Sequence, residues 1–260
     1  MNVSFYKYQG TGNDFIIFDN RKLFFPKRNT LLISRLCDRH MGIGADGLIL
    51  LEKDENSDFK MIYFNADGHQ STMCGNGGRC IVSFAEKLQL FNKSTKFSAI
   101  DGIHSAEIND GVVSLQMMDV NEVKVSKNSV FINTGSPHHI EIVDNLDDIQ
   151  VVNQGREIIN ASYQTEGCNI NFVEKLNNET FKVRTYERGV EDETLACGTG
   201  VTAVAIAMHH INISSSNHIK LMVPGGKLEI KFNEHKGNYT DVILSGPATF
   251  VFEGNIAIPL

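Results

Sequence analysis

Two short segments of the chain place a cysteine directly before a glycine-rich turn. They read "MCGNGGRC" at residues 73–80 and "ACGTGVTA" at 196–203, and each leads into a stretch of helical character. The first turn of a helix leaves N–H groups without internal partners, and the helix dipole favours a negative charge there. A cysteine at such a place has its thiol pKa lowered below about 8.5. Cys74 and Cys197 are therefore predicted to be bases, each beside a turn that can hold a carboxylate.

Two such turns facing each other predict a racemase or an epimerase. One thiolate can remove a proton from a carbon, and the opposing thiol can return a proton to the other face. N–H groups that hold the substrate carboxylate also stabilise the charge that develops on the carbanion. The other three cysteines, Cys37, Cys80 and Cys168, do not precede glycine turns and are interpreted as buried structural residues.

Nucleotide binding is the main alternative interpretation of the glycines. "GTGVTA" matches the dinucleotide pattern G-x-G-x-x-A, but that pattern needs an acidic residue about 20 positions later. Residues 218–223 read "HIKLMV" and contain no acid. A phosphate-binding P-loop would need Gly-Lys-Ser/Thr after the glycines, and both turns lack it. Both nucleotide-binding interpretations are therefore weak.

Strand-like runs bounded by turn residues dominate the rest of the chain, with helical spacing in three segments. These are 28–40, 77–91 and 200–210, and the last is apolar on every side, which predicts a fully buried helix. The order of strand, polar loop, cysteine, glycine turn and helix occurs twice. A length of 260 residues favours two domains. We expect domains at 1–118 and 119–247, with a C-terminal strand at about 248–260 that returns to the first domain.

Composition limits the partners and the location of the protein. A net charge of −7 gives no basic surface for nucleic acid. The N-terminus lacks a signal-peptide pattern, and the apolar runs are too short to span a membrane. With five cysteines, an odd number, the chain is predicted to be cytoplasmic with reduced thiols.

Several motifs occur in the order seen in one known family. They read "QGTGNDFIIFDN", "DRHMGIGADGLILLE", "FNADGHQSTMCGNGGRC", "GSPH", "CNINFV" and "YERGVEDETLACGTG". The chain resembles the diaminopimelate epimerases in these motifs. The resemblance implies interconversion of LL- and meso-diaminopimelate without a cofactor, for lysine and peptidoglycan precursor synthesis. It implies an α/β fold of the α+β kind, with two similar domains, each a curved, mostly antiparallel sheet or barrel around a central helix. It also implies an active site in the interdomain cleft.

The resemblance assigns roles to individual residues. Cys74 and Cys197 are the proton donor and acceptor, His138 supports a catalytic thiol, and Glu187 meets a substrate ammonium and orders the site. Arg188 binds the distal carboxylate, as a guanidinium does in bidentate geometry. The remaining substrate-binding positions are amide side chains and turn residues: Asn13, Asn65, Gly75, Asn76, Asn169, Gly198 and Thr199.

Two positions depart from some family members, which have Gln at Gly47 and Asn at Ser136. We therefore leave both out of the predicted site, or expect only weaker contacts there. The pairs His138/His139 and His209/His210 lack metal-ligand spacing, so no metal is predicted. The partner is a small molecule, and a homodimer is compatible with the family.

Three other functions remain open at this point. A proline or hydroxyproline racemase would share the two thiols but act on a small cyclic substrate. A phenazine-pathway isomerase would lack the cysteine pair. A binding module could use the helix N-termini to hold anions without any chemistry.

Overall fold

The computed structural model describes residues 1–258 and divides the chain into two compact units. Unit 1 comprises 1–115 and 247–260, and unit 2 comprises 116–246. The first boundary thus lies before Gln116, where the sequence placed it after Met118. Among the described residues, no helix is long and apolar enough to cross a membrane.

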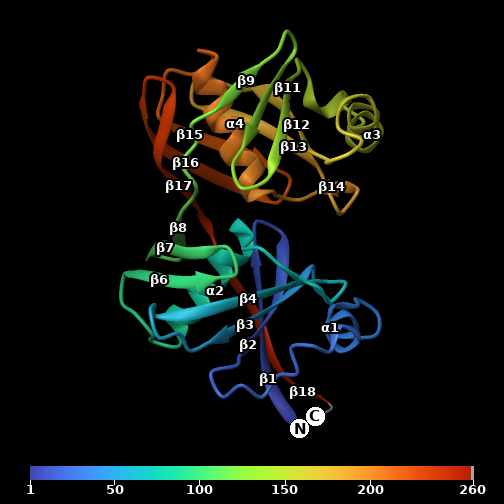
Figure 1. The fold of residues 1–260 in the computed structure, drawn as a ribbon, viewed down its shortest axis with the longest axis vertical. Coiled ribbons are helices and arrows are strands. Elements are labelled where there is room, and N and C mark those ends of the chain that lie inside the picture. Colours follow the sequence, from blue (N-terminus) through green and yellow to red (C-terminus); the bar gives the residue numbers. More distant parts are fainter. Residues whose placement is uncertain (259–260) are drawn as a thin grey trace. The chain divides into compact units, whose positions relative to one another are not determined.

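Unit 1 contains nine strands and two helices (Figure 1). The strands are β1 (Asn2–Gly10), β2 (Asn13–Asp19), β3 (Gly47–Glu52), β4 (Phe59–Asn65), β5 (Gln70–Ser71), β6 (Ser94–Ala99), β7 (Gly102–Asn109), β8 (Val112–Gln116) and β18 (Thr249–Ala257). The helices are α1 (Thr30–Cys37) and α2 (Gly75–Lys87).

The strands of unit 1 pair in the order β18, β1, β2, β3, β4, β6, β7, β8. Two of these pairings, β2 with β3 and β4 with β6, are parallel, and the others are antiparallel. The C-terminal strand β18 thus lies beside the N-terminal strand β1. Helix α2 packs against β1, β2, β3, β4, β7 and β18, so the sheet surrounds it.

Unit 2 contains nine strands, two helices and a short 3-10 turn. The strands are β9 (Val123–Val125), β10 (Ser129–Asn133), β11 (Pro137–Ile142), β12 (Asn169–Lys175), β13 (Thr180–Glu187), β14 (Asp192–Thr194), β15 (His218–Val223), β16 (Gly226–His235) and β17 (Asn238–Pro247). The 3-10 turn is η1 (Leu146–Asp148), and the helices are α3 (Val151–Ser162) and α4 (Gly198–His210).

Unit 2 repeats the pairing scheme of unit 1. Its strands follow the order β9, β10, β11, β12, β13, β15, β16, β17, again with two parallel pairings, β11 with β12 and β13 with β15. The short strands β5 and β14 pair with β4 and β13 respectively. Helix α4 occupies the central place, against β10, β11, β12, β15 and β16. The similar architecture expected from the two cysteine segments is present strand by strand.

The central helix is largely buried in both units. Every residue of α4 from Gly200 to Met208 is buried, as its uniformly apolar sequence predicted. Helix α2 begins two residues before the predicted segment and ends at Lys87. Helix α3 was not among the predicted helices, although its apolar residues Val151, Val152, Ile158 and Ile159 recur at helical spacing and pack against the core of unit 2.

Candidate functional site

Cys74 is the N-cap residue of α2, as its position before the glycine turn predicted. Its Sγ accepts a hydrogen bond from the backbone N–H of Gly77 at 3.5 Å. The Cys74 thiol also lies 3.7 Å from Oδ1 of Asn13, to which it can donate. Cys74 is half-buried, whereas Gly75 and Asn76 behind it are buried. The sulfur therefore sits at the positive end of a helix dipole, where its thiolate form is stabilised.

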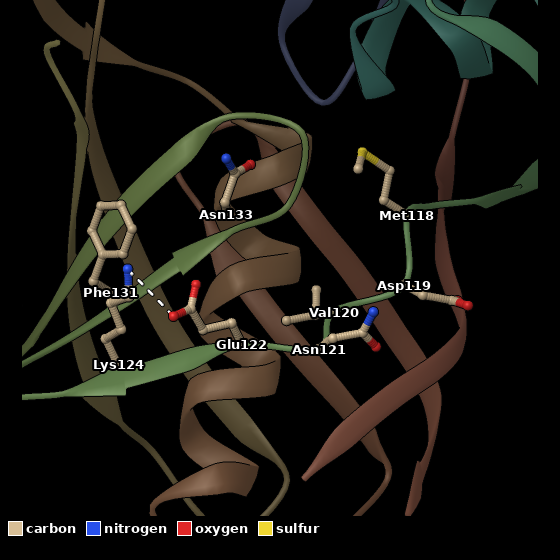
Figure 2. Close-up of a pocket in the computed structure, with 8 residues that line it drawn as sticks. All are labelled: Met118, Asp119, Val120, Asn121, Glu122, Lys124, Phe131 and Asn133. Carbon is tan, nitrogen blue, oxygen red and sulfur yellow. Dashed lines mark ion pairs between the residues drawn. The ribbon is translucent and has the colours of Figure 1, made fainter.

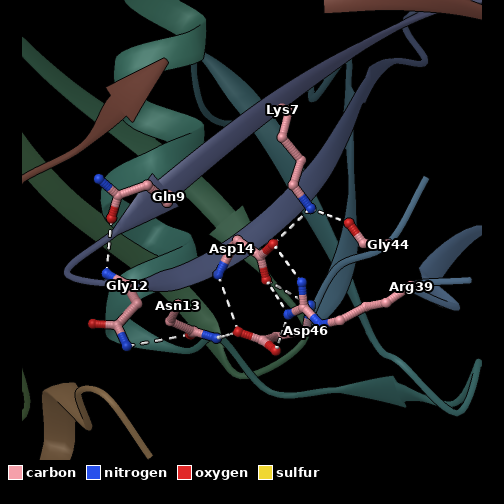
Figure 3. Close-up of polar contacts among 9 residues, drawn as sticks. Lys7, Gln9, Gly12, Asn13, Asp14, Arg39, Gly44 and Asp46 are labelled. Carbon is pink, nitrogen blue, oxygen red and sulfur yellow. Dashed lines mark hydrogen bonds and ion pairs between the residues drawn. The ribbon is translucent and has the colours of Figure 1, made fainter. Parts of the chain in front are cut away.

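Asn13 is held by a network of charged side chains at the start of β2 (Figure 3). Its Nδ2 donates to Oδ2 of Asp46 at 2.7 Å, and its Oδ1 accepts from Nδ2 of Asn76 at 3.2 Å. Asp46 in turn accepts a hydrogen bond from Nη2 of Arg39 at 2.8 Å. The amide of Asn13 is thereby oriented with its oxygen toward Cys74. Asp46, which the sequence analysis did not identify, is the residue that fixes this orientation.

Asp14 forms the second half of the same network. Its carboxylate accepts from Arg39 Nη2 at 2.7 Å and pairs with Lys7 Nζ at 2.7 Å. Lys7 also donates to the backbone carbonyl of Gly44. Burial raises the pKa of the Asp14 carboxyl, but the hydrogen bonds and charges of Arg39 and Lys7 outweigh burial and lower it to about 2. Asp14 is therefore ionised throughout the neutral range and anchors the β1–β2 turn.

Cys197 is the N-cap residue of α4 and is buried. Its Sγ lies 3.5 Å from Oγ1 of Thr199. The same hydroxyl lies 2.9 Å from Nε2 of His138, and Nδ1 of His138 lies 3.1 Å from Nδ2 of Asn171. A line of polar groups therefore runs from Asn171 through His138 and Thr199 to the sulfur.

The protonation of His138 follows from its partners. An amide Nδ2 can only donate, so the Nδ1 atom of His138 accepts and its Nε2 atom carries the proton. Burial, with a smaller effect from Arg188, lowers the pKa of His138 to about 3. The imidazole is therefore neutral, and it donates to Thr199, whose hydroxyl is free to donate to Cys197. The Thr199 hydroxyl thus links His138 to the Cys197 sulfur. Asn171 was missed by the sequence analysis, although it lies in the same "CNINF" motif as Asn169.

Asn169, Arg188 and Ser136 form a separate cluster in unit 2. Asn169 Nδ2 donates to Ser136 Oγ at 2.9 Å, and Asn169 Oδ1 accepts from the backbone N–H of Arg188 at 2.9 Å. The Arg188 guanidinium donates to the carbonyl of Glu166 at 3.0 Å and lies 3.4 Å from Ser136 Oγ. Ser136 thus contacts two predicted substrate-binding residues, although the sequence analysis set it aside. Arg188 is exposed, so its guanidinium is accessible to a ligand.

The remaining predicted residues lie near the ends of strands. Glu187, the last residue of β13, accepts a hydrogen bond from Thr194 Oγ1 at 2.8 Å. Asn65 is exposed at the end of β4 and pairs with Gly47 at the start of β3. A Cβ at Gly47 would lie 2.6 Å from Cε2 of Tyr63. A larger residue at position 47 therefore requires Tyr63 to move.

The other three cysteines are buried away from any helix N-terminus. Burial raises the pKa of Cys37 and of Cys168 to about 12, and it raises the pKa of Cys80 further. These thiols remain protonated and have the structural character expected from the sequence. Within residues 1–258, His, Cys, Asp and Glu side chains form no group of three that could hold a metal ion.

A pocket in unit 2 is lined by eight residues between Met118 and Asn133 (Figure 2). Met118, Asn133 and Phe131 border it, and an ion pair of 3.4 Å joins Lys124 to Glu122 across its floor. None of the predicted site residues lines this pocket. Its titratable groups are the carboxylates of Asp119 and Glu122 and the amine of Lys124, and its lining contains no cysteine.

Solved structures with the same architecture come from several enzymes. A PhzF-family phenazine biosynthesis protein of Bacillus anthracis matches with a TM-score of 0.77 at 14% identity, covering 99% of this chain and 100% of that one. A hydroxyproline epimerase of Agrobacterium vitis matches with a TM-score of 0.72 at 12% identity, covering 99% and 93%. The chain has the two-domain α+β fold of these two proteins.

Sequence comparisons identify the family within this fold. The family model described as diaminopimelate epimerase matches residues 5–125 and 130–251. The diaminopimelate epimerase of Flavobacterium psychrophilum is 57% identical over 256 residues, which cover 98% of this chain and all of that protein. That of Chlorobaculum tepidum is 40% identical, covering 96% and 99%. The chain belongs to the diaminopimelate epimerase family.

Proposed function

We propose that this protein interconverts LL- and meso-2,6-diaminopimelate by moving one α-proton between two cysteines. The observation that carries the proposal is the position of Cys74 and Cys197, each the N-cap of the central helix of its own unit. Family membership supports the substrate. The reaction needs no cofactor, because both proton carriers belong to the chain.

In the proposed step, the thiolate of one cysteine takes the α-proton and the electron pair of the C–H bond remains on the substrate. The thiol of the other cysteine then donates its proton to the opposite face of the same carbon. The configuration inverts, and the two sulfurs exchange protonation states. The reverse reaction uses the same groups with their roles exchanged.

The carbanion requires more stabilisation than proton transfer alone provides. General acid–base catalysis contributes roughly 10²–10⁴-fold, which is too little for so weak a carbon acid. We assign the remainder to backbone N–H groups at Gly75, Asn76, Gly198 and Thr199, which hold the reacting carboxylate. In unit 2, the neutral His138 and the Thr199 hydroxyl keep the Cys197 sulfur hydrogen-bonded as its charge changes.

The distal end of the substrate is assigned to the cluster of Asn169, Arg188 and Ser136. Arg188 has guanidinium atoms that are exposed and already oriented by the Glu166 carbonyl. A guanidinium binds a carboxylate through two parallel hydrogen bonds, which favours a substrate with a second amino-acid head. Glu187 can meet a substrate ammonium, and Asn13 and Asn65 offer amide groups in unit 1.

Solvent hydrogen exchange tests this function directly. Reduced protein is incubated with LL-diaminopimelate in deuterated water, and the incorporation of one α-deuterium is followed by NMR together with the appearance of the meso isomer. We expect both, and we expect no exchange with L-proline or hydroxyproline. Exchange with the cyclic amino acids alone would assign the chain to the racemases, and saturable binding without exchange would make it a binding module.

We further propose that the enzyme works in the cytoplasm, where its thiols stay reduced, and forms a homodimer. Sedimentation velocity over a range of protein concentrations tests the second statement. A single species of one-chain mass at all concentrations would contradict it.

A further inference from the structure

Arg79 is a cation with no exposed surface, located in α2 five residues after Cys74. Its side chain is 0% exposed and is among the largest fully buried side chains of the protein. Burying a charge is costly unless the charge is well paired and hydrogen-bonded. Packing alone therefore does not explain why unit 1 buries a charged arginine at position 79.

The hydrogen bonds of Arg79 all go to neutral oxygens. Nη1 donates to the carbonyl of Gly75 at 3.2 Å, and Nη2 donates to Thr11 Oγ1 at 2.7 Å and to Asn76 Oδ1 at 3.1 Å. Nε donates to the carbonyl of Pro247 at 3.4 Å. Over residues 1–258, no carboxylate lies within ion-pair distance of this guanidinium. Its charge is therefore not neutralised by an acid of the described chain.

These four bonds connect three segments that are far apart in the sequence. Gly75 and Asn76 belong to the Cys74 turn, Thr11 lies in the β1–β2 turn that carries Asn13, and Pro247 is where the chain re-enters unit 1. A Cβ at Gly10 would lie 3.2 Å from Nη2 of Arg79, so the guanidinium is tightly enclosed. The fork of donors holds these segments in one arrangement behind the sulfur.

The corresponding position in unit 2 makes the same contact without a charge. Thr202 also lies five residues after its cysteine, and its Oγ1 donates to the carbonyl of Gly198 at 2.9 Å. In unit 1 that carbonyl contact, to Gly75, is made by a guanidinium. A hydroxyl is therefore sufficient to stabilise such a turn, and the positive charge of Arg79 must serve another purpose.

The thiols near Arg79 interact with this charge. Burial lowers the pKa of Arg79, while the nearby Cys80 and Cys74 sulfurs act in the opposite direction. Cys80 is buried with its own pKa raised, so it stays a thiol. Other charged groups around the turn are Asp14 on β2, which acts on Cys80, and Asp101 with its partner His104 at the β6–β7 hairpin. Cys74 is the sulfur among these that is not fully buried and precedes the helix.

We propose that Arg79 is a positioning residue of the Cys74 turn, which fixes the segments around the sulfur and supplies a buried positive charge that favours its thiolate form. Arg79 acts through Cys74 and does not touch the substrate. This role rests on the proposed function of Cys74 as a proton carrier.

The test measures the reactivity of Cys74 in the whole protein, independently of epimerisation. Parent, Arg79→Gln, Arg79→Lys and Lys87→Gln proteins are alkylated with iodoacetamide from pH 5 to pH 10, and modification at Cys74 is located by tandem mass spectrometry. Lys87 is the matched control, because it is an exposed cation on the same helix that pairs with Glu253. Circular dichroism and thermal unfolding establish that each variant is folded.

We expect the midpoint of Cys74 alkylation to rise by about one pH unit or more in Arg79→Gln, since a lost neighbouring charge shifts a pKa by roughly 1–3 units. Arg79→Lys keeps the charge but not the fork of donors. Its midpoint should stay within about half a unit of the parent while kcat falls about tenfold or more. Lys87→Gln should match the parent in both measurements.

A parent-like midpoint in folded Arg79→Gln, or an equal rise in Arg79→Gln and Arg79→Lys, would overturn the electrostatic role. If Arg79→Gln does not fold, the Arg79→Lys variant provides the test of the proposal. Turnover equal to that of the parent in Arg79→Lys would overturn the positioning role. Absence of hydrogen exchange in the parent would refute the proposed function instead, with the alkylation result unaffected.

Discussion

The two units share one pairing scheme and differ in the groups that surround their cysteines. In unit 1 the Cys74 turn is supported by charged side chains. These are Arg79 on α2 and the network of Arg39, Asp14 and Asp46 beside Asn13. In unit 2 the Cys197 turn is supported by neutral groups, namely His138, Asn171, Thr199 and Thr202. The same backbone framework therefore carries two different electrostatic environments.

This difference separates what the backbone contributes to each turn from what the side chains contribute. The backbone places a sulfur at the N-terminus of a buried helix in both units, which is enough for a thiol of altered reactivity. The side chains then decide how each thiolate is stabilised. If Arg79 acts on Cys74 as proposed, a buried cation stabilises the thiolate in unit 1 and neutral hydrogen-bond donors stabilise it in unit 2.

Removing either sulfur has the largest expected effect and tests whether the two turns are equivalent partners. Cys74→Ser and Cys197→Ser should each lower kcat for epimerisation by about 10³-fold or more, because a hydroxyl is a far weaker acid and base. A coupled assay of meso-diaminopimelate formation measures kcat for each variant. Cys37→Ala, in the core of unit 1, is the control and should lose stability but keep its turnover. Near-normal turnover in either serine variant would refute the two-thiol mechanism.

Removing the Thr199 hydroxyl tests the neutral support of Cys197 alone. Thr199→Val breaks the link between His138 and the sulfur and should lower kcat/KM by about 10–100-fold. Thr199→Ser keeps the hydroxyl and should recover most of the loss. The alkylation profile of Cys74 should not change in either variant. If the valine and serine variants behaved alike, the hydroxyl link would have no function.

Adding one methyl group to each glycine turn compares how tightly the turns are packed. A Cβ at Gly200 would lie 2.6 Å from Oδ1 of Asn171, which is buried and holds Thr185. At Gly77 the nearest atoms are 3.3 Å away and include the flexible end of Met61. Gly200→Ala should therefore lower the free energy of unfolding by about 2–3 kcal/mol, and Gly77→Ala by about 1 kcal/mol. Urea unfolding measures both, and the reverse order would be inconsistent with this packing.

The charged network of unit 1 predicts an acid-dependent loss of stability. The pKa of Asp14 is about 2 in the folded protein and about 4 when unfolded, so the unfolded chain takes up the proton first as pH falls. Stability from this group is complete above about pH 4 and is lost between about pH 4 and pH 2, amounting to about 2 kcal/mol or less. Asp14→Asn should lack this part of the pH dependence in chemical unfolding. A pH profile identical to that of the parent would contradict the assigned pairing.

Local sequence was enough to predict the start of both central helices. Cys74 and Cys197 were expected to precede helices because glycine turns and apolar helical runs follow them, and both are N-caps. The fully buried character of α4 followed from its composition. Helix α3 was missed even though the helical spacing of Val151, Val152, Ile158 and Ile159 is present in the sequence itself.

The family, the two cysteine turns and the segments that carry them could be predicted from the sequence. They depend on residues that are near neighbours in the chain. Only the tertiary structure decided which groups surround each sulfur. Asp46 bonds to Asn13, and Asn171 bonds to His138. Arg79 bonds to both Thr11 and Pro247. These partners are far apart in the sequence, so no local pattern predicts them. Hydrogen bonds need atoms within about 3 Å of each other. For segments distant in sequence, strand pairing and burial set those distances.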